Sequence, residues 1–178
     1  MVEYRRELVQ QEILRLDSKP EPLRDELGRF AKAPKRPYEN RPSELLKTAT
    51  PGVGSVSFQP GASLSPNEQN AVDWMHDNLG GDIIVRAESG VPNVPNPDIK
   101  WRGELVDIKH ISGNSNTLDT AIRIAMRQTN NNGAFIDISG SAFSDAKAID
   151  TAARRLSRRG GNYVILIRDG VLVGYINS

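Results

Sequence analysis

The amino-acid sequence predicts an α/β protein in which one mixed β-sheet is flanked by helices and preceded by an extended arm. Two observations predict this fold. After residue 64 the apolar residues switch between helical and strand spacing, and capping residues or glycines separate the segments. Before that point prolines are frequent and no period is sustained. We therefore divide the chain into an arm at residues 1–63 and an α/β domain at residues 64–178.

The composition excludes several classes of protein. A chain of 178 residues has room for one folded domain and an appendage. Its 23 Lys and Arg residues balance 22 Asp and Glu residues, which excludes binding by bulk positive charge. The absence of Cys excludes disulfides, zinc–thiolate sites and thiol nucleophiles. No apolar run reaches the roughly 18 residues of a membrane span and the charged start is no signal peptide, so we expect cytoplasmic synthesis and no membrane partner.

The arm has two segments of different character. Residues 2–16 carry an apolar stripe at helical spacing, and a single helix cannot bury such a stripe without a partner. Residues 19–63 are rich in Pro, Gly, Ser, Lys and Arg and indicate an extended linker with a short helical turn at residues 43–47. We expect the arm to become ordered only against a partner.

The first half of the domain begins with a strong helix signal. Ser65 and Glu68 form a capping box with Pro66 at the first helical position, and the helix should end at Gly80-Gly81. Three strands should follow, the last two joined as a hairpin around Arg102-Gly103-Glu104. These strands are expected at residues 82–86, 99–101 and 105–109.

The second half alternates helices with strands. Thr117 can cap a helix that ends at the Asn-rich turn before Gly133, and Ser144 can cap another that ends at Gly160-Gly161. Strands are expected at residues 134–138, 163–167 and 171–176, and the last two should form a hairpin.

Two acidic residues and a lysine should meet on the first hairpin. Strand alternation puts Asp107 and Lys109 on one face, and the hairpin brings Asp98 close to both. Two such carboxylates can hold a divalent cation such as Mg²⁺ that activates water, while the ammonium stabilises charge on a scissile phosphate. The same groups without metal can serve acid–base ribonuclease chemistry, with His110 as the side chain that titrates near neutrality.

These residues resemble known nuclease motifs. Pro97-Asp98, followed by Asp107-Ile108-Lys109, resembles the motif of PD-(D/E)XK nucleases, and the order of elements from 65 to 139 is similar to that superfamily's core. The longer pattern through the Asn-rich turn, the helix with Gln128 and the terminal hairpin resembles the C-terminal toxin domains of CdiA-type contact-dependent inhibition proteins. Many of those domains cleave tRNA, some as PD-(D/E)XK enzymes and others in the metal-independent barnase, EndoU, colicin and RelE group.

The resemblance implies roles for particular residues and partners. It implies Asp98, Asp107 and Lys109 as catalytic residues, with Asp98 and Asp107 as metal ligands if the reaction uses Mg²⁺. We add His110 to the catalytic candidates for its own acid–base chemistry. It further implies tRNA as the substrate, an immunity protein as a partner and delivery into the cytoplasm of a target cell. The residues expected to bind RNA are Thr117, Arg123, Arg127 and Gln128. The gap between Asp98 and Asp107 is short for PD-(D/E)XK enzymes, so metal dependence stays open.

The same residues also have structural interpretations. Asp-x-Lys is common on the solvent face of a hairpin, and a histidine such as His110 is often a surface residue. Arg123 and Arg127 continue a helical ladder from Asp119 and can form ion pairs within the helix. The arginines at 154–159 complement the negative end of their helix dipole.

A second class of function comes from the arm. Residues 24–31 are similar to short segments of bacteriophage head proteins, some of which carry nuclease-like or toxin-like C-terminal domains. This resemblance implies a virion component that uses a toxin-like fold as a structural module without catalysis. In that alternative the arm docks onto a virion or carrier subunit.

Overall fold

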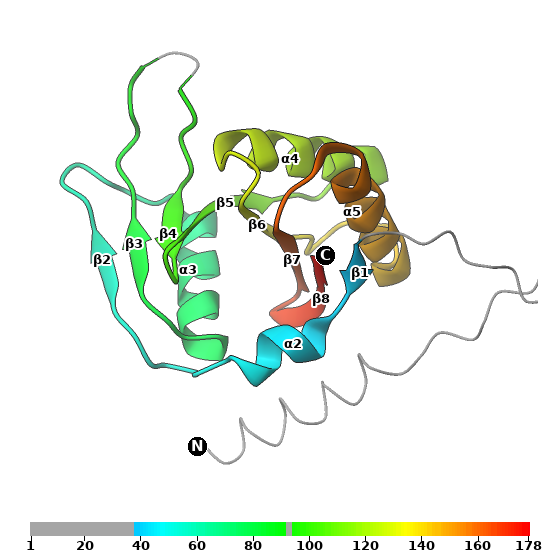
Figure 1. The fold of residues 1–178 in the computed structure, drawn as a ribbon, viewed down its shortest axis with the longest axis horizontal. Helices are drawn as coiled ribbons and strands as arrows, with labels where there is room; N and C mark the ends of the chain where they lie inside the picture. Colours follow the sequence, from blue (N-terminus) through cyan, green and yellow to red (C-terminus); the bar gives the residue numbers. More distant parts are fainter. Residues whose placement is uncertain (1–37, 92–93) are drawn as a thin grey trace, which may run out of the picture.

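Eight strands form one mixed sheet in the computed structural model, which describes residues 38–91 and 94–178 (Figure 1). The strands are β1 (Glu39–Asn40), β2 (Val56–Phe58), β3 (Ile83–Val85), β4 (Ile99–Trp101), β5 (Glu104–His110), β6 (Gly133–Asp137), β7 (Tyr163–Arg168) and β8 (Val171–Asn177). Their order across the sheet is β1-β8-β7-β6-β5-β4-β3-β2. Strands β5, β6 and β7 are parallel to one another, β2 is parallel to β3, and the remaining neighbours are antiparallel.

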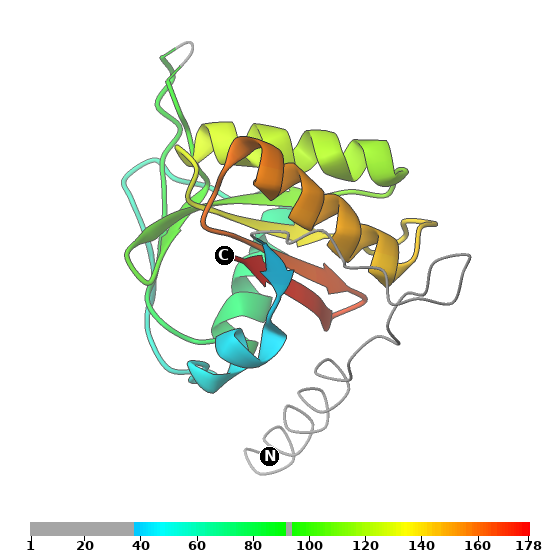
Figure 2. The ribbon, with the colours of Figure 1, turned by 45° about the vertical axis from the view of Figure 1, so that its right-hand side comes forward.

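Helices cover both faces of this sheet. The described helices are α2 (Pro42–Lys47), α3 (Pro66–Asn78), α4 (Ser115–Gln128) and α5 (Asp145–Arg159). Helices α4 and α5 connect the parallel strands and pack against each other on one face, while α3 lies on the other (Figure 2). The predicted α/β class, with its order of helices and strands after residue 64, is confirmed.

Side-chain caps fix where the long helices begin. The side-chain oxygen of Ser65 accepts from Glu68 N, and Glu68 Oε2 accepts from Ser65 N at 2.7 Å, so the capping box forms as expected. Ser144 caps α5, also as expected. Helix α4 is capped by Asn114 instead of Thr117, because the side-chain Oδ1 of Asn114 accepts from the backbone N–H groups of Asn116 and Thr117.

Two hydrophobic cores lie on the two faces of the sheet. The core under α4 and α5 contains residues from those helices and from β6, β7 and β8, among them Leu118, Ile136 and Leu156. The core under α3 includes Met75 and Phe135, with Trp74 packed against Phe135 at a centroid distance of 5.6 Å. Burial of this apolar area on both faces is the main force that holds the layers together.

Two short strands lie within residues 38–63, where the sequence indicated an extended linker. Strand β1 pairs with β8 at one edge, and β2 pairs with β3 at the other. Leu45 of α2 is 4% exposed and joins the core under α3. The sequence did not predict β1 and β2 because strands of two or three residues are too short to show an alternation of apolar and polar residues. The strands that pair with them also lie further along the chain. The helical turn expected at residues 43–47 is part of α2.

The expected N-terminal helix at residues 2–16 and the phage-like segment at residues 24–31 lie outside the described residues. Within the described part of the chain, no helix is long and apolar enough to span a bilayer.

Candidate active site

A tight turn between β4 and β5 brings the predicted acidic residues together. Arg102 and Gly103 have φ values of 49° and 87°, and two consecutive left-handed residues match the twist of a two-residue hairpin. The turn sets the register in which Ile99 faces Val106, so Asp98 lies opposite Asp107 one position further on. Asp98 Oδ2 accepts a hydrogen bond from Ile108 N at 2.6 Å.

Asp107 and Lys109 form an ion pair on the same face of β5. Lys109 Nζ lies 2.5 Å from Asp107 Oδ2. The carboxylate is 2% exposed whereas the lysine side chain is 31% exposed, so the pair opens to solvent on the ammonium side. Among the described residues, this ammonium is the cation that pairs with Asp107. A buried carboxylate oxygen held by a single cation can accept a further positive group.

The two carboxyls perturb each other's protonation. Burial, and then the negative charge of Asp107, raise the pKa of Asp98 from 3.8 to about 7. Burial also raises the pKa of Asp107, although the nearby Lys109 ammonium opposes the change. Near neutral pH the pair therefore carries less than its full negative charge unless a cation compensates it.

A third carboxylate, whose sequence context indicates only a helix cap, acts on this pair through its charge. The charge of Glu68 raises the pKa of both Asp98 and Asp107. Its Oε2 is bound to Ser65 N in the capping box, so the start of α3 holds it in place. The capping box by itself explains why a glutamate stands at this position. Because Glu68 lies 30 or more residues before Asp98 and Asp107 in the chain, the sequence gives no sign that its charge acts on them. Within residues 38–91 and 94–178, no three His, Asp or Glu side chains are close enough to hold a metal ion together.

The other predicted site residues lie in different places. Gln128, at the end of α4, accepts a hydrogen bond from Asn96 N at 2.7 Å and so ties α4 to the loop before Asp98. His110 alternates to the opposite face of β5 from Lys109, and its Nδ1 lies 3.2 Å from Asp137 Oδ2. Thr117 lies in the capped first turn of α4. The structure thus joins the Asp98 and Asp107 pair to Lys109 and leaves His110 outside this group.

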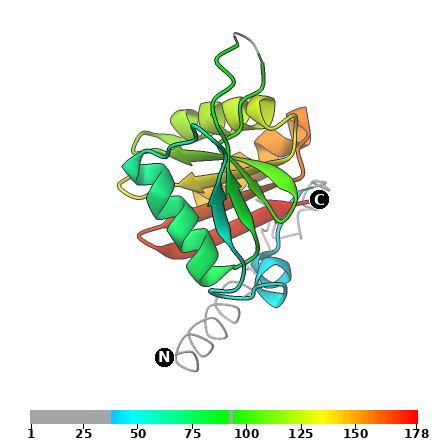
Figure 3. The same cartoon turned by 90° about the vertical axis from the view of Figure 1, so that its left-hand side faces the viewer.

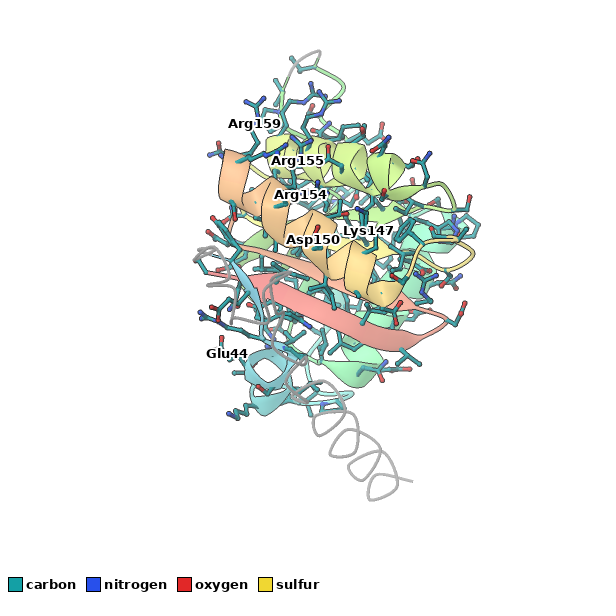
Figure 4. The ribbon with its side chains drawn as sticks, turned by 90° about the vertical axis from the view of Figure 1, so that its right-hand side faces the viewer. Glu44, Lys147, Asp150, Arg154, Arg155 and Arg159 are labelled. Carbon is teal, nitrogen blue, oxygen red and sulfur yellow. The ribbon has the colours of Figure 1, made fainter. Side chains whose placement is uncertain are left out.

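Arginines gather beside Gln128, at the ends of α4 and α5. They line a cavity of about 650 Å³ together with Pro95 and the left-handed Asn130 and Asn131. The arginines of this cavity are Arg123, Arg127, Arg155 and Arg159. Figure 4 shows Arg155 and Arg159 on α5.

Only part of this arginine cluster is explained by ion pairs. Asp119 of α4 binds Arg155 of α5 through both of its oxygens, so this carboxylate links the two helices. Arg154 pairs with Asp150 within α5, as the helix-stabilising interpretation expects. Arg123 and Arg127 remain exposed on the wall of the cavity.

Comparisons with known proteins assign no family. No family model matches the chain, and no curated protein matches its sequence. Among solved structures, the chain is similar to one from the CdiA-CT/CdiI toxin and immunity complex of Burkholderia pseudomallei, with 18% identity and a TM-score of 0.44. The match covers 68% of this chain and 99% of that one. This likeness assigns no function, so the role of the site follows from its own geometry.

Proposed function

We propose that the chain is a nuclease that hydrolyses phosphodiester bonds, with RNA, and tRNA in particular, as its substrate. The observation that carries the proposal is the pair of facing carboxyls, Asp98 and Asp107, with Lys109 Nζ 2.5 Å from the more buried one. Phosphodiester hydrolysis needs an activated water molecule and a positive group that stabilises the charge on the phosphate. A pair of carboxylates can supply the first and a neighbouring lysine the second. The preference for RNA comes from the resemblance of the sequence to tRNA-cleaving toxin domains.

The acidic pair fits a divalent cation. Asp107 Oδ2 is buried against the Lys109 ammonium, and burial raises the pKa of both carboxyls, so a bound cation would stabilise their charged forms. Mg²⁺ suits the site because it is commonly held by one or two carboxylates together with substrate phosphate oxygens. Asp98 and Asp107 would hold it, and Glu68 adds negative charge nearby. When bound, the ion would polarise the phosphate and lower the pKa of a water molecule.

The remaining residues of the site position the substrate. The partly exposed Lys109 ammonium can donate to a phosphate oxygen and stabilise the charge that develops there. Gln128 holds Asn96 and so fixes the loop that leads into Asp98. Arg123 and Arg127 line the neighbouring cavity and would contact the RNA backbone.

Incubation of the full chain with unfractionated tRNA and with duplex DNA, each with Mg²⁺ and with chelator, tests the proposal. We expect cleavage of tRNA that requires Mg²⁺. Asp107→Asn and Lys109→Met should each lower the cleavage rate about 100-fold or more, because each removes an interaction with the reacting groups. Asp73→Asn, a change at an exposed carboxylate of α3, is the matched control and should cleave normally.

The outcomes separate the possibilities. Cleavage that persists with chelator would favour the metal-independent chemistry. Cleavage of DNA alone would correct the substrate. Normal activity in folded Asp107→Asn would remove this site from consideration, and no cleavage of either nucleic acid would refute the nuclease.

A toxin role and an immunity partner accompany this proposal through the sequence resemblance. Expression in a bacterial cytoplasm should arrest growth in a manner that depends on Asp107. The virion alternative is based on residues 24–31, which lie outside the described part of the chain, and no observation on the described residues favours it.

A further inference from the structure

The carboxyl pair lies in line with a cation on the neighbouring strand. Strands β3 and β4 pair with Val85 opposite Ile99, and Arg86 N donates to Asp98 O at 2.9 Å. Arg86 is therefore the cross-strand neighbour of Asp98, just as Asp107 is on the other side. Residues at paired positions project from the same face of a sheet. This row crosses three strands and ends at the candidate active site.

A second row runs beside it on the same face. Ile84 is paired with Lys100, and Lys100 with Leu105. Lys100 is two residues from Asp98 and Leu105 is two residues from Asp107, so alternation puts both rows on one face. Ile84 is 37% exposed and Lys100 is exposed.

This face of the sheet is uncovered. The alternate residues Ile83, Val85 and Ile99 are fully buried in the core under α3, so the helix covers only one side of these strands. Figure 3 shows β2, β3 and β4 toward the viewer with no helix in front of them. The open side forms a cavity of about 460 Å³. Its lining residues are Gln59, Ile84, Arg86, Lys100, Gly103 and Leu105.

The charge of this surface is positive and uncompensated. In the part of the chain that the structure describes, neither Arg86 nor Lys100 forms an ion pair, and no acidic residue lines the cavity. Other arginines of the domain have a structural partner. Arg102 binds backbone oxygens, Arg155 binds Asp119 and Arg168 binds Asp145.

We infer that the open face of β2–β4 is a second binding surface for the RNA backbone, on the far side of the catalytic carboxyls from the α4–α5 cavity. Arg86 and Lys100 neutralise phosphates, and the aliphatic Ile84 and Leu105 provide an apolar floor for sugars or bases. The bound RNA strand then passes over Asp98 and Asp107 between the open face and the α4–α5 cavity. The phosphate that is cleaved therefore lies in the interior of the RNA strand and not at its end. This inference rests on the proposed nuclease function and adds where its substrate runs.

Salt-dependent binding to unfractionated tRNA tests the surface. The full chain with Asp107→Asn serves as the background, so that cleavage does not interfere. Arg86→Gln and Lys100→Gln together should reduce the slope of log affinity against log salt by about 1.4 to 1.8, since each phosphate contact contributes about 0.7 to 0.9. Lys47→Gln together with Lys147→Gln, at exposed positions of α2 and α5, removes the same two charges elsewhere and should leave the slope unchanged. Circular dichroism melts would verify that every variant folds.

The substrate's route can be tested separately in the active chain. With Asp107 intact, the Arg86→Gln/Lys100→Gln variant should raise the KM for tRNA cleavage about tenfold or more while kcat changes little, because the residues bind but do not react. An oligonucleotide whose cleavage site lies near one end cannot reach both basic surfaces. Its KM should therefore not depend on Arg86 and Lys100.

The result that overturns the inference differs from the one that overturns the function. If the wild-type chain cleaves tRNA and the double variant keeps the wild-type slope and KM, the open face does not bind RNA and the nuclease stands. If the chain binds tRNA through Arg86 and Lys100 but never cleaves it, the surface stands and the nuclease falls. If it neither binds nor cleaves tRNA, the surface and the nuclease both fall.

Discussion

Strands β5–β8 and strands β2–β4 belong to one sheet but have different surroundings. The first set is covered on both faces, by α4 and α5 on one side and by α2 and α3 on the other. The second set is covered on one face only, and its other face exposes Ile84 and Lys100. Asp98 and Asp107 lie where the two sets meet. At that boundary a carboxylate can be buried enough to have a raised pKa and still be reached by a substrate.

The largest expected effect comes from removing the edges of this sheet. A chain that begins at residue 61 lacks β1, α2 and β2, together with the hydrogen bond from Arg41 N to Tyr175 O and the packing of Leu45. Its free energy of unfolding should fall by more than the about 2–5 kcal/mol that truncation of one buried leucine costs. Urea denaturation followed by circular dichroism measures this. A truncated chain as stable as the full one would show that residues 38–60 only rest on the domain.

The two sets of strands should respond differently to loss of a side chain. Phe135 of β6 is fully buried, so Phe135→Ala should lower the free energy of unfolding by about 3–5 kcal/mol. Ile84 of β3 is 37% exposed on the open face, and Ile84→Ala should cost less than about 1 kcal/mol. Equilibrium denaturation of both variants measures the contrast. Equal costs would mean that something covers the open face in solution.

The smallest effect concerns pH at the boundary itself. Between pH 4 and 7 folded Asp98 holds a proton that the unfolded chain releases, so the free energy of unfolding should fall as pH rises through this window. Asp98→Asn cannot titrate and should remove about 1–2 kcal/mol of that fall. Denaturation at pH 5 and pH 8 of the wild type, Asp98→Asn and Asp73→Asn measures it. If Asp98→Asn keeps the wild-type pH dependence, the pKa of Asp98 is not raised.

Much of the domain was predictable because its signals are local. The Ser65 box and the Ser144 cap each act within four residues, and the hairpin needs only a turn that accepts two left-handed residues. The Asn114 cap was missed because several polar residues compete for the same helix start. Strands β1 and β2 were missed because their pairing partners, not their own sequences, decide that they are strands.

The sequence by itself determined that Asp107 and Lys109 share a face and that a hairpin delivers Asp98 to them, because strand alternation and turn geometry are properties of neighbouring residues. Only the tertiary structure decided how deeply the carboxyls are buried, that the charge of Glu68 acts on them, and that one side of β2–β4 stays open. Those features depend on which distant elements come to cover a residue. Burial and charge proximity, which set the pKa of Asp98 and the accessibility of Arg86, exist only once the chain has packed.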